Sequence, residues 1–154
     1  PNMATDSIDL AIRDDLSAQA DCTFNLLCSD RLYPACHPSL LALAAEQRVT
    51  LHGEREMDWS HWTVAGGAHV GQRDSGLNFS DPGLLLDAAC NGLGIALVSQ
   101  LLAQHAHDAG LLQPLTEQRV RGANWAWLLH RDSEHNPLAR HFCQWLQSAL
   151  PAGA

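Results

Sequence analysis

The sequence contains no lysine, and its nine basic residues are arginines scattered from Arg13 to Arg140 without a cluster. Together with 17 acidic residues they give a formal net charge of −8. A chain with this charge repels nucleic acid, because affinity for DNA depends on basic side chains that neutralise phosphates. A helix-turn-helix pattern with a basic face is also missing. These 154 residues are therefore not expected to bind DNA by themselves.

Long apolar runs are missing as well. No stretch of about 18 apolar residues could span a bilayer, and the first residues lack the basic and apolar regions of a signal peptide. We therefore expect no membrane partner and, by default, a cytoplasmic location.

Motifs for metal binding and for common catalytic chemistry are also absent. The five cysteines are odd in number and irregularly spaced, with no C-x-x-C pair, so free thiols are predicted. Nine histidines are present, but none has the H-E-x-x-H spacing of a metal site. The chain also lacks a G-x-S-x-G elbow and a glycine-rich phosphate loop. Neither a metal nor a cofactor is expected.

Hydrophobic residues make up 46% of the chain, enough for a globular core. Strands are predicted at residues 8–13, 24–36, 48–52, 77–79, 95–98, 111–115 and 125–129, with the second broken at Ser29-Asp30 and interrupted at Pro34. Helices are predicted at 39–45, after Asp58, after Asp81, after Ser99 and after Asn136. Strands that alternate with helices indicate an α/β fold with open sheets.

Five segments, in this order, resemble the signatures of LysR-type effector domains. They are residues 9–13 (DLAIR), 32–38 (LYPACHP), 58–62 (DWSHW), 76–81 (GLNFSD) and 88–97 (AACNGLGIAL). Each motif alone is weak, but five in the correct order make chance similarity improbable. The subgroup of glycine-cleavage and β-lactamase regulators is the most similar.

The resemblance implies a periplasmic-binding-protein-like fold, with two α/β lobes joined by two crossing strands and a small effector in the cleft between them. Applied to this sequence, the family's arrangement places residues 1–37 and 121–154, with the crossing strands, in lobe one. It places residues 38–120 in lobe two. The resemblance also implies that the DNA-binding winged helix-turn-helix lies outside this chain. The first strand, helix and strand of lobe one would lie outside it too, so lobe one is expected to be N-terminally incomplete.

Candidate effector-binding residues follow from the same resemblance. Phe79 and Ser80 precede a helix N-terminus, where free N–H groups favour an anion, and this loop faces the cleft in the family. Asp81 is interpreted as a helix cap, because its charge would oppose an anionic effector. Trp125 and Trp127 alternate on the second crossing strand and share one face, which predicts either core packing or an aromatic cleft wall.

Cys36 and His37 have two interpretations. Neighbouring thiol and imidazole groups could form a nucleophile and its base, but consecutive side chains of an extended segment point to opposite faces. A hinge or cleft-lining role is the other possibility.

Two functions remain open on these grounds. The first is an effector sensor that binds a small polar metabolite, with an anion as one candidate, and that forms homo-oligomers and reaches DNA only through the absent N-terminal domain. The second is a small α/β thiol-dependent hydrolase that uses Cys36.

Overall fold

The computed structural model describes residues 3, 6–15, 17, 19–72 and 76–150. The strands are β1 (Leu10–Arg13), β2 (Cys22–Cys36), β3 (Ala96–Ser99), β4 (Gln113–Pro114) and β5 (Val120–His130). The α-helices are α1 (Trp59–Val64), α2 (Pro82–Cys90), α3 (Gln100–Asp108) and α4 (Pro137–Ala149). Short 3-10 helices are η1 (Pro38–Leu40), η2 (Ala45–Gln47), η3 (Arg55–Met57) and η4 (Arg131–Ser133). None of the described helices is both long enough and apolar enough to cross a membrane.

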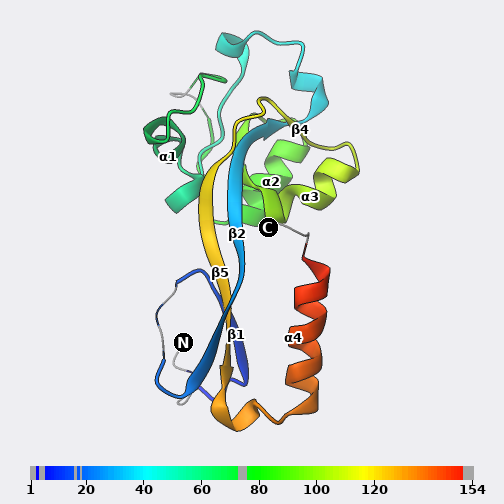
Figure 1. Cartoon of the computed structure of the whole chain (residues 1–154). Helices are drawn as coiled ribbons and strands as arrows, with labels where there is room; N and C mark the ends of the chain where they lie inside the picture. The colour runs from blue at the N-terminus through cyan, green and yellow to red at the C-terminus, as the bar shows by residue number, and fades with distance from the viewer. Residues whose placement is uncertain (1–2, 4–5, 16, 18, 73–75, 151–154) are drawn as a thin grey trace. The chain divides into compact units, whose positions relative to one another are not determined.

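The described strands form one sheet in the order β1-β5-β2-β3, and β4 pairs with β2 (Figure 1). β1 pairs antiparallel with β5, with Leu10 opposite Leu129, and β2 pairs antiparallel with β3, with Leu32 opposite Ser99. The long strands β2 and β5 lie side by side in the middle of this order.

The predicted break in the second strand is wrong, because β2 continues through all 15 of its residues. Ser29 does not start a turn, since its hydroxyl donates to the Asn124 side chain at 2.7 Å across the sheet. Pro34 is buried within the strand opposite Leu97, and its carbonyl accepts a hydrogen bond from the Leu115 N–H at 3.0 Å. Tertiary partners therefore outweigh the local preference for a turn at Ser29-Asp30 and for an edge at Pro34.

The chain divides into two compact units. Unit 1 combines residues 1–30 with residues 123–154, and unit 2 is the continuous stretch 31–122. β2 and β5 each contribute residues to both units. The lobe boundaries expected at 37/38 and 120/121 stay a prediction.

Unit 2 has two layers of buried side chains around its strands. One cluster places Leu85 and Ala89 of α2 against Ala96 and Val98 of β3. The other places Trp59 and Trp62 of α1 with Ile95 and Leu97. Since all four residues of β3 are buried, helices and loops cover both of its faces, as expected for a strand inside an α/β layer.

The helix starts of unit 2 agree with the predicted caps. Asp58 accepts a hydrogen bond from the Ser60 N–H at 2.7 Å, Asp81 from the Leu84 N–H at 2.9 Å, and Ser99 from the Leu102 N–H at 3.1 Å. The helix predicted at 39–45 is wrong. η1 occupies its first part, because the His37 ring caps a single turn through the Ser39 N–H, and η2 follows as a separate turn.

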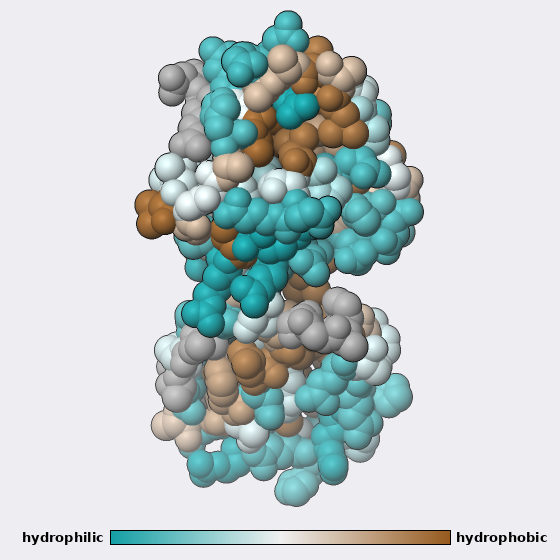
Figure 2. Space-filling model, turned by 45° about the horizontal axis from the view of Figure 1, so that its top comes forward, coloured by the Kyte–Doolittle hydropathy of each residue, from teal (hydrophilic) through white to brown (hydrophobic). Residues whose placement is uncertain are grey.

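Unit 1 consists of β1, the neighbouring parts of β2 and β5, and α4. Trp127 and Leu129 of β5 pack with Cys143 of α4, and Leu10 of β1 adds to this cluster. Asn136 caps α4 by accepting from the Leu138 N–H at 3.0 Å. On the face shown in Figure 2, hydrophilic side chains cover much of the surface, with apolar patches between them.

Candidate functional site

Two chain segments of unit 2 run parallel and end side by side. His52 bridges in parallel to Asn78, with the His52 N–H donating to the Leu77 carbonyl at 2.9 Å and the Phe79 N–H donating to the His52 carbonyl at 2.8 Å. The loops that follow, from Gly53 and from Ser80, therefore leave the same edge. In open α/β sheets this is where ligands bind, beyond the carboxyl ends of parallel strands.

A hollow of about 460 Å³ opens at this edge. It is lined by His52, Gly53, Glu54, Arg55, Asp58, Asn78, Phe79 and Ser80. The volume lies within the range of about 300–1,000 Å³ that is typical of small-molecule sites.

Buried contacts behind the hollow hold its first loop in place. The Trp59 indole Nε1 donates to the Leu51 carbonyl at 2.8 Å, and Met57 packs against the buried cluster of α2 and β3. Gly53 has no room for a side chain, since a Cβ there would lie 2.8 Å from Leu85 Cδ2 and 3.0 Å from the Met57 carbonyl oxygen. The loop therefore rests directly on the core.

Arg55 has a left-handed backbone with φ of 56°, which is uncommon for a residue other than glycine. Such a conformation costs about 1–3 kcal/mol and persists only where the surrounding structure enforces it. Here the turn of η3 and the packing of Met57 on the core enforce it. As a result, Glu54 and Arg55 both line the hollow.

Acidic groups dominate the charge of this site. Glu54 and Asp58 line the hollow with exposed side chains. Hydrogen bonds from the backbone and hydroxyl of Ser60 lower the pKa of Asp58, and the nearby His52 adds to this effect. Asp58 is therefore ionised at neutral pH.

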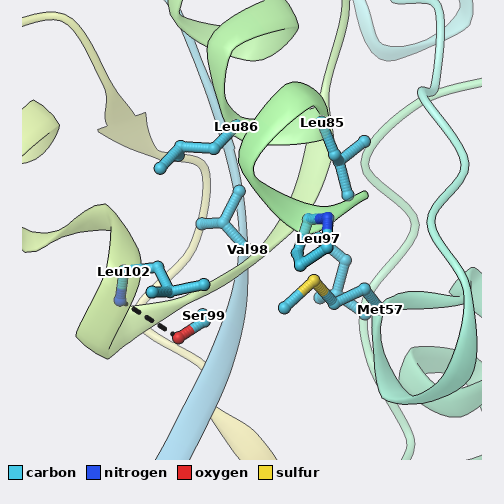
Figure 3. A pocket seen from close by; sticks show the side chains of 8 residues that line it. Met57, Leu85, Leu86, Leu97, Val98, Ser99 and Leu102 are labelled. Carbon is cyan, nitrogen blue, oxygen red and sulfur yellow. Dashed lines mark hydrogen bonds between the residues drawn. The ribbon is translucent and has the colours of Figure 1, made fainter. Parts of the chain in front are cut away.

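A second, apolar pocket lies between α2, β3 and the start of α3 (Figure 3). Its lining includes Met57, Leu85, Leu97 and Leu102, and it leaves no space for even a water molecule. Ser99, the polar residue of its lining, already accepts a hydrogen bond from the Leu102 N–H. This pocket is a packing detail of the core rather than a ligand site.

The predicted site residues fall into three places. Phe79 and Ser80 line the hollow. Cys36 and His37 also belong to unit 2, but they do not line it. Trp125 and Trp127 belong to unit 1, where their indole N–H groups are buried without a hydrogen-bond partner among the described residues.

The hydrolase interpretation of Cys36 is wrong. The Cys36 side chain is completely buried, and this burial raises the pKa of its thiol, so that the nucleophilic thiolate is disfavoured. The neighbouring imidazole is engaged elsewhere, since His37 Nδ1 lies 2.8 Å from Ser39 Oγ and caps η1.

Sequence reasoning missed the first loop of the hollow, from His52 to Asp58. Its signal was the position of this loop just after the predicted strand at residues 48–52, where an α/β sheet presents its ligand-binding loops. In the described part of the chain, no three His, Cys, Asp or Glu side chains gather as they would around a metal ion.

These features together define an effector-binding α/β domain of the periplasmic-binding-protein-like type. The chain belongs to the LysR substrate binding domain family, whose model matches residues 2–151. The resemblance seen in the sequence motifs is therefore confirmed, and so is the expectation that the chain is not an enzyme.

Individual relatives agree with this assignment. The chain is 28% identical to the HTH-type transcriptional activator AmpR of Citrobacter freundii over 158 residues, which cover 96% of the chain and 53% of AmpR. It thus spans about half the length of that relative.

Solved structures show the same fold. The AmpR effector binding domain from Citrobacter freundii aligns with a TM-score of 0.72 and 20% identity, over 96% of this chain and 77% of that one. Full-length LysG from Corynebacterium glutamicum, with its bound effector Arg, aligns with a TM-score of 0.65 and 20% identity, over 96% of this chain and 53% of that one.

Proposed function

We propose that this chain is the sensing part of a longer bacterial transcriptional regulator, and that its effector contacts the hollow at Phe79 and Ser80. The observation that carries the proposal is the hollow itself, at the carboxyl ends of two parallel segments in a member of an effector-binding family. LysG, a structural neighbour, is described with a small effector bound, which supports a metabolite as the ligand class.

Four of the predicted site residues lie outside the hollow. Cys36 and His37 near the first crossing strand, and Trp125 and Trp127 on the second, are proposed to contribute to effector binding as the family resemblance implies. The two unpaired indole N–H groups support this role for the tryptophans, because a buried donor without an acceptor costs about 1–3 kcal/mol. An effector oxygen would supply the missing acceptor.

Effector binding can change the DNA binding of the full regulator through a coupled conformational equilibrium. An effector that binds one conformation better than another shifts the population between them, and a longer chain can pass this shift to its DNA-binding part. The net charge of −8 supports DNA contact through a separate domain rather than through this chain. Homo-oligomers through the effector domains and a cytoplasmic location are part of the same proposal, since both fit regulators of this family.

A thermal-shift screen of metabolites tests the proposal, because a ligand that binds the native state must raise its apparent stability. Hits are then measured on Ser80→Ala and Phe79→Ala, with Ser148→Ala in α4 as the matched surface control. We expect both hollow variants to weaken binding and the control to leave it unchanged. If a metabolite binds Ser80→Ala and Phe79→Ala as tightly as it binds the wild type, the placement of the site is refuted.

A further inference from the structure

The charge of the hollow points to a particular ligand class. Resting on the proposed function, we infer that the effector carries a net positive charge, and that its cationic amino group binds between Glu54 and Asp58. Both carboxylates line the hollow, on the loop that follows the bridge residue His52.

Among the described residues, no ion pair neutralises either carboxylate. Asp58 is held in its charged form by hydrogen bonds from Ser60, which lower its pKa, and these bonds leave its charge in place. Glu54 makes no capping hydrogen bond at the start of η3. Of the described arginines, Arg55 lines the hollow, and it takes part in an interaction of its own.

The helix N-terminus next to Ser80, which was expected to favour an anion, already carries a negative charge. The N-terminus of α2 follows Ser80, but Asp81 accepts the Leu84 N–H at 2.9 Å and places a negative charge at that helix end. Pro82, the first helical residue, has no N–H to offer. An anionic effector in the hollow would therefore meet Glu54 and Asp58, and the helix end next to Ser80 carries the negative charge of Asp81.

The remaining lining fits the rest of such a ligand. Asn78 and Ser80 offer neutral hydrogen-bonding groups, and the half-buried Phe79 ring can face an alkyl chain or an ammonium group. The ligand class is therefore a small amine or an amino acid with a cationic side chain.

Three probes of similar size and different charge test this inference on the 154-residue chain. L-lysine, L-glutamine and L-glutamate are titrated separately while amide chemical shifts are followed by NMR. We expect affinity to fall in the order lysine, glutamine, glutamate, with shift changes at residues 52–58 and 78–80. We also expect lysine binding to weaken with added sodium chloride, because salt screens exposed charges.

Variants assign the effect to the two carboxylates. Glu54→Gln/Asp58→Asn removes both charges and retains a capping side chain at position 58, since asparagine caps helices as well as aspartate does. Glu46→Gln/Glu117→Gln removes two exposed charges of unit 2 outside the hollow. The first double variant should bind lysine roughly 3- to 10-fold more weakly, as expected for exposed ion pairs, and the second should bind it like the wild type.

Stronger binding of glutamate, equal binding of all three probes, no response to lysine, or the same loss in both double variants would overturn the inference. So would lysine binding that salt leaves unchanged, a result that needs no variant to fold. The proposed function is tested separately, by the metabolite screen. If a metabolite from the screen depends on Phe79 and Ser80 but is anionic, the site is right and the ligand class is wrong.

Discussion

The indole Nε1 of Trp59 donates a 2.8 Å hydrogen bond to the carbonyl oxygen of Leu51, and both residues are buried. Trp59 begins α1, and Leu51 lies just before the loop that lines the hollow. Because the Leu51 N–H donates to the Ile95 carbonyl at 2.7 Å, both backbone groups of Leu51 are paired. Leu51 therefore connects α1, the residue just before β3 and the loop that lines the hollow.

Trp59→Phe should lower the free energy of unfolding by about 2–3 kcal/mol, because it removes ring volume and leaves the buried Leu51 carbonyl without its donor. Trp127→Phe is the matched control. Trp127 is similarly buried, but its N–H has no partner among the described residues, so the same change removes an unpaired donor. Urea denaturation of both variants gives the comparison. Equal losses would show that the hydrogen bond to Leu51 contributes nothing.

Two adjacent glycines should respond in different ways to substitution. A Cβ on Gly67 would lie 2.1 Å from Cε2 of the buried Trp62 ring, so Gly67→Ala should cost about 3 kcal/mol or more through overpacking. Gly66 has φ of +78° and open space around it, so Gly66→Asn should cost less than about 1 kcal/mol, because asparagine tolerates this backbone. Thermal unfolding monitored by circular dichroism distinguishes the two. The reverse order would contradict the packing described for Trp62.

The stability contributed by Asp58 should depend on pH. Its pKa in the folded chain is lowered from 3.8, so its stabilising effect is complete above that value and is lost as the pH falls through the lower folded value. The stability difference between the wild type and Asp58→Asn should therefore be largest above pH 5 and shrink below pH 4. Chemical denaturation at several pH values measures it. A difference that stays constant from pH 7 to pH 2.5 would mean that Asp58 has the same pKa in both states.

Amide hydrogen exchange should separate β1 from β3. β1 contains only half-exposed and exposed residues and lies at one end of the strand order, whereas all four residues of β3 are buried. Amides of residues 10–13 should therefore exchange faster than those of residues 96–99, because local opening is easiest where few apolar contacts are lost. Mass spectrometry or NMR of a dilute sample reports both rates. Equal protection would show that β1 opens only with the whole fold.

Local chemistry made the helix starts predictable. Asp58, Asp81, Ser99 and Asn136 were each predicted to precede a helix, and each caps one. Such caps depend on residues within three positions along the chain, so sequence alone contains the relevant information. The family resemblance, which depends on five ordered motifs, was likewise confirmed.

Long-range partners account for the errors. The continuity of β2 at Ser29 depends on Asn124, and this contact has no local signature. The hollow was only half predicted for the same reason. Phe79 and Ser80 were identified, but the parallel bridge from His52 to Asn78 brings in Glu54 and Asp58 from more than 20 residues away. The negative charge that Glu54 and Asp58 give the hollow could therefore be recognised only in the structure.

The two units differ in how the chain builds them. Unit 2 is one uninterrupted stretch, residues 31–122, whereas both ends of the chain contribute to unit 1. The chain enters unit 2 along β2 and leaves it along β5, and these strands are hydrogen-bonded neighbours about 5 Å apart. Unit 2 is thus inserted into unit 1, and the two ends of the insertion lie on neighbouring strands. A single replacement of residues 31–122 would exchange all of the described lining of the hollow with that of a relative, while the proposed contacts of Trp125 and Trp127 in unit 1 stay the same.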